Sequence, residues 1–201
     1  LDRAKIFWLT TPSSPSGKIA SLEYLTAWVQ WCRDRDIIAC SDEAYSEIYF
    51  GDPPHSALEV STDGVLVFNS LSKRSAMTGY RVGWVAGDPA LIAEYRKLKA
   101  NIDTGTPWFI QDAAIAAYAD ESHVAEMREE YRLRMQLFVE AFESAGLPRC
   151  ESEASMYVWQ KTPEGVTSGQ LAEALLDEKL LAVTIPSEAL VGDPTRHGPD
   201  E

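Results

Sequence analysis

The sequence predicts a layered α/β domain followed by a smaller, incomplete α+β lobe. Short apolar runs bounded by turn residues are typical of buried strands, and amphipathic helical patterns lie between several of them. The alternation of these two patterns favours helices packed on a largely parallel sheet. With 201 residues, of which 45% are hydrophobic, the chain is long enough to bury a sizeable core.

The first part of the chain contains four apolar runs that we expect to be strands, at residues 5–9, 37–40, 65–68 and 82–86. A helix is expected from Ser21, whose hydroxyl can cap it, to about residue 36. Its apolar residues recur at helical spacing and are Leu22, Leu25, Trp28, Val29 and Cys32. Pro89 is expected to start a second helix that runs to about residue 100. We assign residues 1–121 to this partial large domain.

The second part of the chain begins with helical patterns. One helix is expected over residues 108–119, and a long amphipathic helix over residues 122–145 is expected to end at Gly146. A helix of this length commonly bridges two lobes. A strand at 156–160, a helix at 168–179 and a strand at 181–185 then predict a small α+β lobe. We therefore assign residues 122–201 to a linking helix and a partial C-terminal domain.

Charge and composition narrow the classes of function. A net charge of −13 and a pI near 4.6 argue against nucleic acid and anionic membranes as partners. No apolar run reaches the length of a membrane span and no signal peptide is visible, so we expect a cytoplasmic protein. The three cysteines fit buried, reduced thiols. Neither they nor His55, His123 and His197 have the spacing of metal ligands, so we predict no metal site.

The residues that carry chemistry follow the apolar run at 65–68. Polar groups at the carboxyl end of a buried strand are where open α/β sheets bind ligands. Ser70, Ser72 and Arg81 suit a phosphate, because they offer two hydroxyl donors and one planar guanidinium. A lysine in such an electropositive, partly dry place has a lowered pKa and becomes an amine nucleophile towards an aldehyde. Lys73 among phosphate-binding groups therefore suggests pyridoxal 5'-phosphate (PLP), whereas the alternative is a solvated loop with a surface lysine.

The sequence of this stretch resembles that of a known family. Ser-Leu-Ser-Lys at 70–73, followed by Gly-Tyr-Arg-Val-Gly-Trp at 79–84, is similar to the lysine segment of the class I/II, fold-type I PLP-dependent aminotransferases. Through residues 85–89 it looks most like the succinyldiaminopimelate branch of that family. The resemblance implies an aspartate aminotransferase-like large domain with three αβα layers, PLP as cofactor, and Lys73 as the residue that carries it.

Two further motifs resemble the same family. Residues 11–17 are similar to its Asn-Pro-x-Asn-Pro-Thr-Gly motif, with Ser14 at the second asparagine, whose amide donates to the phenolic oxygen of PLP. Serine offers a single donor on a side chain shorter than that of asparagine. Asp42 and Tyr45 match the family's Asp-x-x-Tyr, which implies that Asp42 faces the pyridine nitrogen and Tyr45 the phenolic oxygen. We expect Glu43 and Glu47 to be solvated charges.

The resemblance implies an aminotransferase that moves an amino group between an amino acid and a 2-oxo acid, with the succinyldiaminopimelate step of lysine biosynthesis as its specific reaction. Lys73 would act as the general base, and Arg81, Ser70 and Ser72 would anchor the phosphate. Because the chain begins at Leu1 and ends in Asp200-Glu201, we expect an internal fragment of a longer protein. The fragment should show little activity alone, and the full-length protein is expected to be a homodimer.

Three alternatives remain open at this stage. A PLP-dependent β-lyase would use the same scaffold and differ in substrate. An aminotransferase-like effector domain of a transcription regulator would be preceded by a DNA-binding helix-turn-helix in the full gene. A degraded copy would no longer bind the cofactor; the presence together of Asp42, Tyr45, Lys73 and Arg81 argues against it.

Overall fold

The computed structural model describes residues 3–177. Within them the chain divides into two compact units, Leu1–Glu140 with Glu151–Trp159, and Ala141–Cys150 with Gln160–Glu201. The first unit holds the whole sheet and every predicted site residue. The division predicted between residues 121 and 122 stays a prediction.

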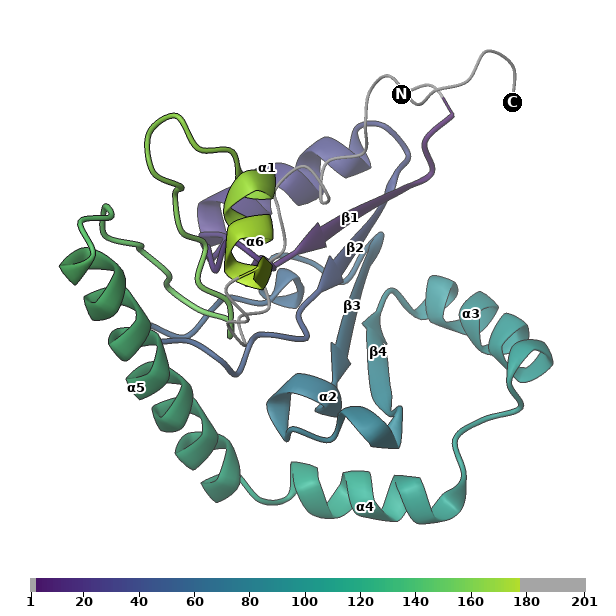
Figure 1. Cartoon of the computed structure of the whole chain (residues 1–201). Coiled ribbons are helices and arrows are strands. Elements are labelled where there is room, and N and C mark those ends of the chain that lie inside the picture. Colours follow the sequence, from purple (N-terminus) through teal and green to yellow (C-terminus); the bar gives the residue numbers. More distant parts are fainter. Residues whose placement is uncertain (1–2, 178–201) are drawn as a thin grey trace. The chain divides into compact units, whose positions relative to one another are not determined.

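A four-stranded sheet forms the centre of the first unit (Figure 1). Its strands are β1 (Ile6–Thr10), β2 (Ile38–Asp42), β3 (Val65–Ser70) and β4 (Gly83–Gly87), in the order β1-β2-β3-β4. The first three strands are parallel and β4 is antiparallel to β3. The carboxyl ends of β2 and β3 and the start of β4 therefore lie at one edge of the sheet. All four predicted strands are confirmed, each within two residues of its expected bounds.

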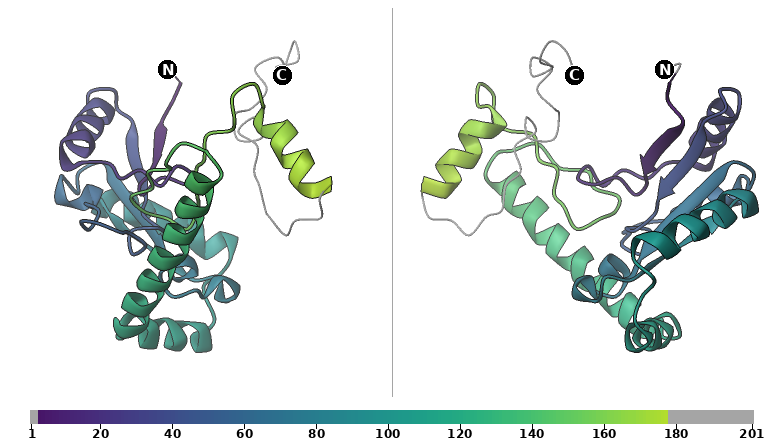
Figure 2. Two further views of the ribbon diagram at one scale, coloured as in Figure 1. Left: turned by 60° about the vertical axis from the view of Figure 1, so that its left-hand side comes forward. Right: turned by 90° about the vertical axis from the view of Figure 1, so that its right-hand side faces the viewer.

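Helices lie against both faces of the sheet, as the predicted three-layer fold requires (Figures 1 and 2). Helix α1 (Leu22–Arg33) begins at Ser21, whose side chain accepts a hydrogen bond from the backbone N–H of Tyr24. Its apolar face packs on alternate residues of the strands and forms the main core, which is Leu25, Trp28, Val29, Cys32, Ile37, Ala39, Ala57, Val65 and Val67. On the opposite face, Tyr95 contacts Phe68 edge-on at 6.4 Å between ring centroids. Tyr95 lies in α3 (Pro89–Ile102).

The remaining elements are mostly helical. A short helix α2 (Leu71–Arg74) follows β3 directly, and the 3-10 turns are η1 (Ala57–Glu59) and η2 (Thr78–Tyr80). Asp88 caps α3 by accepting from the backbone N–H groups of Ala90 and Leu91. The other helices are α4 (Trp108–Tyr118), α5 (Ser122–Ser144) and α6 (Ser168–Asp177). In the part of the chain that is described, no helix is both long and apolar enough to cross a membrane.

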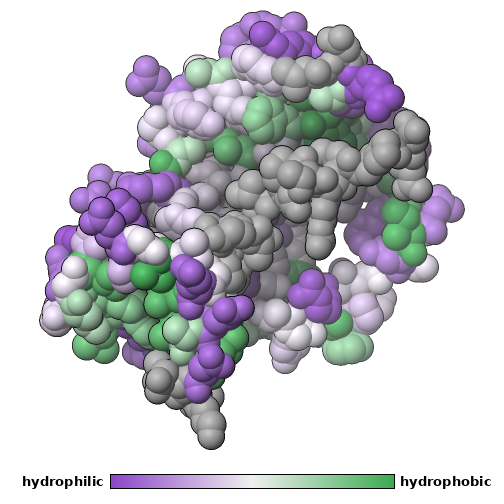
Figure 3. All heavy atoms as spheres, turned by 45° about the horizontal axis from the view of Figure 1, so that its top comes forward, coloured by the Kyte–Doolittle hydropathy of each residue, from purple (hydrophilic) through white to green (hydrophobic). Residues whose placement is uncertain are grey.

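The structure corrects two expectations. β1 is not a buried strand, because Ile6 and Trp8 are about half exposed, at 52% and 54%. Successive strand residues point to opposite faces, and α1 covers only the face on which Phe7 meets Trp28. Hydrophobic residues are correspondingly visible among hydrophilic ones on the surface (Figure 3).

The second correction concerns residues 156–160, which form no strand. A single antiparallel bridge lies earlier, between Tyr49 and Ala154, and the backbone of residues 153–155 bonds to Gly17, Ile48 and Phe50. The helix predicted over 168–179 is confirmed as α6 within the described residues. The strand predicted at 181–185 lies outside them.

Candidate functional site

A pocket of about 460 Å³ opens at the edge of the sheet where β2 and β3 end. Open α/β sheets bind ligands in this position. Five of the predicted site residues line it: Asp42, Ser70, Ser72, Lys73 and Arg81. Trp8, Ala44, Phe68, Asn69 and Thr78 complete the lining. The structure therefore brings together predicted site residues that are up to 39 positions apart in the sequence, from Asp42 to Arg81.

Lys73 stands on α2, which starts immediately after β3. Leu71 is fully buried and fixes this helix to the core, so the half-buried Lys73 faces the pocket from a rigid support. The Lys73 Nζ atom lies 5.5 Å from the centre of the Tyr45 ring. At this distance the ammonium group interacts with the electron-rich face of the ring.

Ser70 and Ser72 form a linked pair at the end of β3. Ser70 Oγ accepts from the backbone N–H of Ser72 at 3.1 Å, lies 2.9 Å from Ser72 Oγ, and can donate to the carbonyl of Val82 at 3.1 Å. A hydroxyl carries one proton. When Ser70 donates that proton to Ser72 Oγ, the proton of Ser72 is available to a ligand in the pocket.

Arg81 reaches the pocket through the pairing of β4 with β3. Gly83 lies opposite Ser70 in the antiparallel register, so the residues just before β4 come to the strand ends of β2 and β3. Arg81 has a left-handed backbone conformation with φ of 52°. Its guanidinium donates to the carbonyl of Thr78 at 2.9 Å and is exposed. A planar cation held at this point can bind a phosphate.

Asp42 is the last residue of β2 and supplies the only carboxylate among the lining residues. One of its oxygens accepts from the backbone N–H of Ala44 at 3.1 Å. Its backbone carbonyl accepts from Thr11 at 3.0 Å, which ties the loop after β1 to the same edge. The carboxylate is thus oriented by its own turn and can receive a positively charged N–H group.

Tyr45 and Ser14 do not line the pocket, although they lie beside it and contact each other. The Tyr45 side chain is 7% exposed, and burial raises its pKa to about 12, because the tyrosinate loses its hydration. Ser14 acts in the opposite direction and lowers that pKa, because its hydroxyl favours the tyrosinate. The hydroxyl oxygen of Tyr157 lies 3.4 Å from the hydroxyl oxygen of Tyr45.

The expectation that Glu43 is a solvated charge is wrong. Glu43 is 5% exposed, and its carboxylate accepts from Ser41 Oγ and from the backbone N–H of Ala57, both at 2.9 Å. Burial raises the pKa of this carboxyl above its ordinary value. Glu43 therefore anchors the residue 55–60 turn to the end of β2, beside Asp42. Glu47, for which the same was expected, is partly buried and pairs with Arg128 at 3.0 Å.

Sequence reasoning missed part of the pocket wall. Trp8 and Phe68 contact each other with ring centroids 4.7 Å apart and ring planes at 44°, and they give the pocket an aromatic side. Asn69 donates through Nδ2 to the carbonyl of Glu43 and to Ser46 Oγ, so it locks the ends of β2 and β3 together. The only sequence signal for these residues was their position at strand ends.

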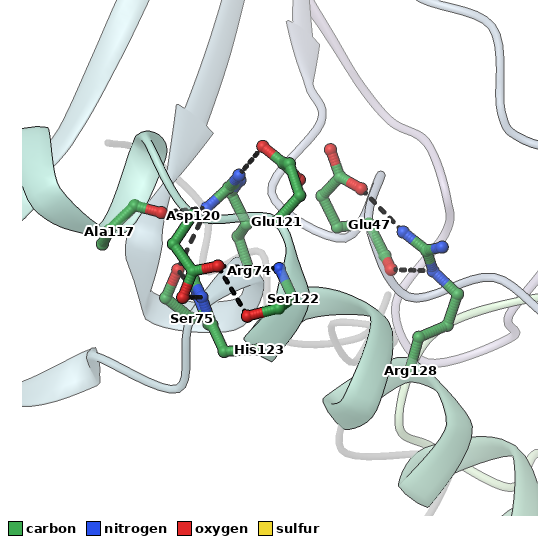
Figure 4. Close-up of polar contacts among 9 residues, drawn as sticks. All are labelled: Glu47, Arg74, Ser75, Ala117, Asp120, Glu121, Ser122, His123 and Arg128. Atoms are coloured by element: carbon green, nitrogen blue, oxygen red, sulfur yellow. Dashed lines mark hydrogen bonds and ion pairs between the residues drawn. The ribbon is translucent and has the colours of Figure 1, made fainter.

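Arg74, the neighbour of Lys73, is buried and was not singled out either. Its guanidinium donates to the carbonyl of Ala117 at 2.9 Å, pairs with Glu121 and lies 4.9 Å from the centre of the Tyr118 ring. His123 Nε2 lies 2.9 Å from Ser75 Oγ, and Figure 4 shows both links between α2 and the α4–α5 junction. The helix that carries Lys73 is therefore fastened on its far side by polar contacts.

Replacing Glu121 by glutamine is expected to lower the free energy of unfolding by about 1–3 kcal/mol, because the Arg74 guanidinium, 5% exposed, loses its counter-charge. Urea unfolding of this chain measures the effect. Glu130→Gln is the matched control, since its pair with Arg134 is more than half exposed on both sides and should contribute about 0.5 kcal/mol or less. Equal losses in both variants would contradict a special role for the pair that Glu121 makes with the buried Arg74.

Comparisons with known proteins agree with this architecture. The family model of aminotransferases of class I and II matches residues 1–196. The LL-diaminopimelate aminotransferase of Aquifex aeolicus is 39% identical over 186 residues, which cover 90% of this chain and 48% of that protein. LL-diaminopimelate aminotransferase 2 of a Nostoc species is 38% identical over 180 residues, covering 88% and 46%. The chain thus spans about half the length of the curated relatives it matches.

Solved structures give the same result. Aminotransferase AspB from Helicobacter pylori superposes with a TM-score of 0.86 at 31% identity, covering 96% of this chain and 51% of that one. A Thermus thermophilus aspartate aminotransferase variant reaches a TM-score of 0.86 at 25% identity, covering 94% and 53%. The predicted aspartate aminotransferase-like fold is confirmed. On the family match and these relatives together, the chain belongs to the class I and II aminotransferases.

Proposed function

We propose that the protein to which this chain belongs is a PLP-dependent aminotransferase that moves an amino group between an amino acid and a 2-oxo acid. One observation carries the proposal: an amine, a carboxylate, two hydroxyls and a guanidinium line a single pocket at the carboxyl ends of two parallel strands. Class I and II membership supports the same chemistry.

The donor set of the pocket fits PLP. Arg81 and Ser72 can bind a phosphate, Asp42 can receive a protonated ring nitrogen, and Lys73 offers an amine to an aldehyde. The Trp8 and Phe68 rings supply apolar surface for a flat aromatic ring. When bound, PLP supplies an electron sink for cleavage of a bond at the substrate α-carbon.

The chain's own residues then have distinct tasks. Asp42 would hold a proton on the ring nitrogen, because a carboxylate favours a cationic N–H group beside it. Lys73 would be the general base, which accepts a proton at its Nζ atom and later donates it from the same atom. Ser70 keeps Ser72 in place, and Ser72 and Arg81 hold the phosphate. Tyr45 and Ser14, which lie beside the pocket, would offer hydroxyl groups to the phenolic oxygen of the cofactor.

The substrate we propose is a diaminopimelate. The curated relatives are named LL-diaminopimelate aminotransferases, and the sequence of the lysine segment resembles the succinyldiaminopimelate branch. Both names share the diaminopimelate skeleton, which supports a role in lysine biosynthesis. We further propose that the full-length protein is a cytoplasmic homodimer.

Covalent attachment of the cofactor tests the proposal. The chain is incubated with PLP, reduced with borohydride, digested and analysed by mass spectrometry. We expect close to one adduct per chain, located on Lys73, and loss of that adduct in Lys73→Ala. Lys97→Ala is the control, since Lys97 is an exposed residue of α3 paired with Glu94. Labelling of Lys73 no stronger than that of Lys97 would contradict the proposal.

The substrate is tested separately with the full-length protein. We expect LL-diaminopimelate or its succinyl derivative to serve as amino donor, with consumption of one 2-oxo acid for each amino group transferred. Release of ammonia without consumption of a 2-oxo acid would indicate a β-lyase instead.

A further inference from the structure

The segment Glu153–Tyr157 belongs to the first unit and contacts the loops beside the pocket. The backbone N–H groups of Glu153 and Ala154 both donate to the carbonyl of Gly17, at 3.1 and 3.0 Å. Ser155 donates its backbone N–H to the carbonyl of Ile48 at 2.8 Å. The segment is thus bound to the loop that contains Ser14 and to the turn that follows Tyr45.

Gly17 shows how closely the segment approaches. A Cβ atom at this position would lie 2.1 Å from Ser152 Oγ and 2.5 Å from the carbonyl oxygen of Ala154. Its φ of +69° also favours glycine. The close approach fixes the position of the segment relative to Ser14, three residues earlier.

Tyr157 is aimed from this segment at Tyr45. The two hydroxyl oxygens are 3.4 Å apart, and the two rings meet edge to face with centroids 6.1 Å apart. The backbone N–H of Tyr157 donates to Ser155 Oγ at 3.3 Å, and Ser155 is fully buried, so the direction of Tyr157 is set by the chain itself.

We infer that Tyr157 is a positioning residue that holds the Tyr45 ring beneath Lys73, with Ser14 acting on the same hydroxyl. The inference rests on the proposed function in so far as Tyr45 faces a bound cofactor. Tyr157 contributes through Tyr45 and is not among the residues that line the pocket.

The two neighbours act on Tyr45 in opposite directions. Contact with Tyr157 raises the pKa of Tyr45, because a second tyrosine hydroxyl bonds the protonated form, whereas the Ser14 hydroxyl stabilises the tyrosinate and lowers it. Asp42 is the other ionisable group that raises this pKa, and Lys73 lies over the ring. Removing one hydroxyl at a time therefore separates a positioning effect from simple loosening of the site.

The experiment is a pH titration of Tyr45 by fluorine NMR, in the chain without cofactor and labelled with 3-fluorotyrosine. The resonance is assigned with Tyr45→Phe. In Tyr157→Phe we expect the Tyr45 titration midpoint to fall by about half a pH unit, which corresponds to one ordinary hydrogen bond. In Ser14→Ala we expect it to rise. Tyr131→Phe, on α5, is the control and should leave it unchanged.

An unchanged midpoint in Tyr157→Phe would overturn the inference. A fall of equal size in Ser14→Ala would also overturn it, because both variants would then merely expose Tyr45 to water. With PLP added, Tyr157→Phe but not Tyr131→Phe should shift the pH at which the bound cofactor changes its absorbance. If the unaltered chain takes up no PLP, the proposed function fails, while the tyrosine titration still decides the role of Tyr157.

Discussion

Replacing Asp42 by asparagine in the full-length protein is expected to lower kcat by about a hundredfold or more, as removal of a single preorganised electrostatic partner does in other active sites. The side chain keeps its size and can still accept from the Ala44 N–H group. It loses the negative charge that would keep a proton on the ring nitrogen of PLP. We also expect weaker PLP binding, measured by dialysis against dilute cofactor.

Asp63→Asn is the matched control for Asp42→Asn. Asp63 precedes β3, at the opposite edge of the sheet, and its side chain is 81% exposed beside Arg33. Its replacement should leave both turnover and cofactor affinity unchanged. If Asp42→Asn retained full turnover, Asp42 would have only the structural role of closing the turn after β2.

Gly87→Ala is expected to destabilise the chain by about 3–5 kcal/mol. A Cβ atom at this position would lie 2.0 Å from the carbonyl oxygen of Val65 and 3.0 Å from the Cα atom of Leu66. Both atoms belong to the backbone of β3, so no side-chain rotation can relieve the contact. The φ of +147° adds strain for any residue with a side chain. Urea unfolding of this chain provides the measurement.

Gly51→Ala tests whether this loss is specific. No atom lies within 4 Å of a Cβ built at Gly51, so the substitution should change the free energy of unfolding by about 0.5 kcal/mol or less. Because β3 leads directly to Ser70 and Lys73, Gly87→Ala should also weaken PLP attachment at Lys73. A stable Gly87→Ala chain would contradict the close strand approach.

Much of the candidate site could be predicted from local sequence because its residues stand directly after strands. Asp42 ends β2, and Ser70, Ser72 and Lys73 end or follow β3. Parallel strands bring their carboxyl ends to one edge, so the apolar runs themselves indicated that these side chains would meet. The family resemblance supplied the roles, which stay predictions for each residue, together with the family, which is confirmed.

Other features depended on contacts between distant segments. β1 reads as an ordinary buried strand, yet its exposure follows from which faces the helices cover. Glu43 and Arg74 look like surface charges, and they are buried because Ala57 and Ala117 offer backbone partners to them. Residues 156–160 have a strand-like composition, but they form no strand, and the backbone N–H of Tyr157 donates to the Ser155 side chain instead of to a sheet edge.

The apolar periodicity and the strand-end chemistry were thus sufficient for the α/β class, the order of the elements, and the meeting of Asp42 with Lys73. These properties follow from local rules, namely which residues favour strands and where parallel strands end. Only the folded structure shows that the pairing of β4 with β3 brings Arg81 to the pocket. The same holds for the contact between Tyr157 and Tyr45. Such contacts arise from close packing between segments up to 112 residues apart, and no local pattern encodes that packing.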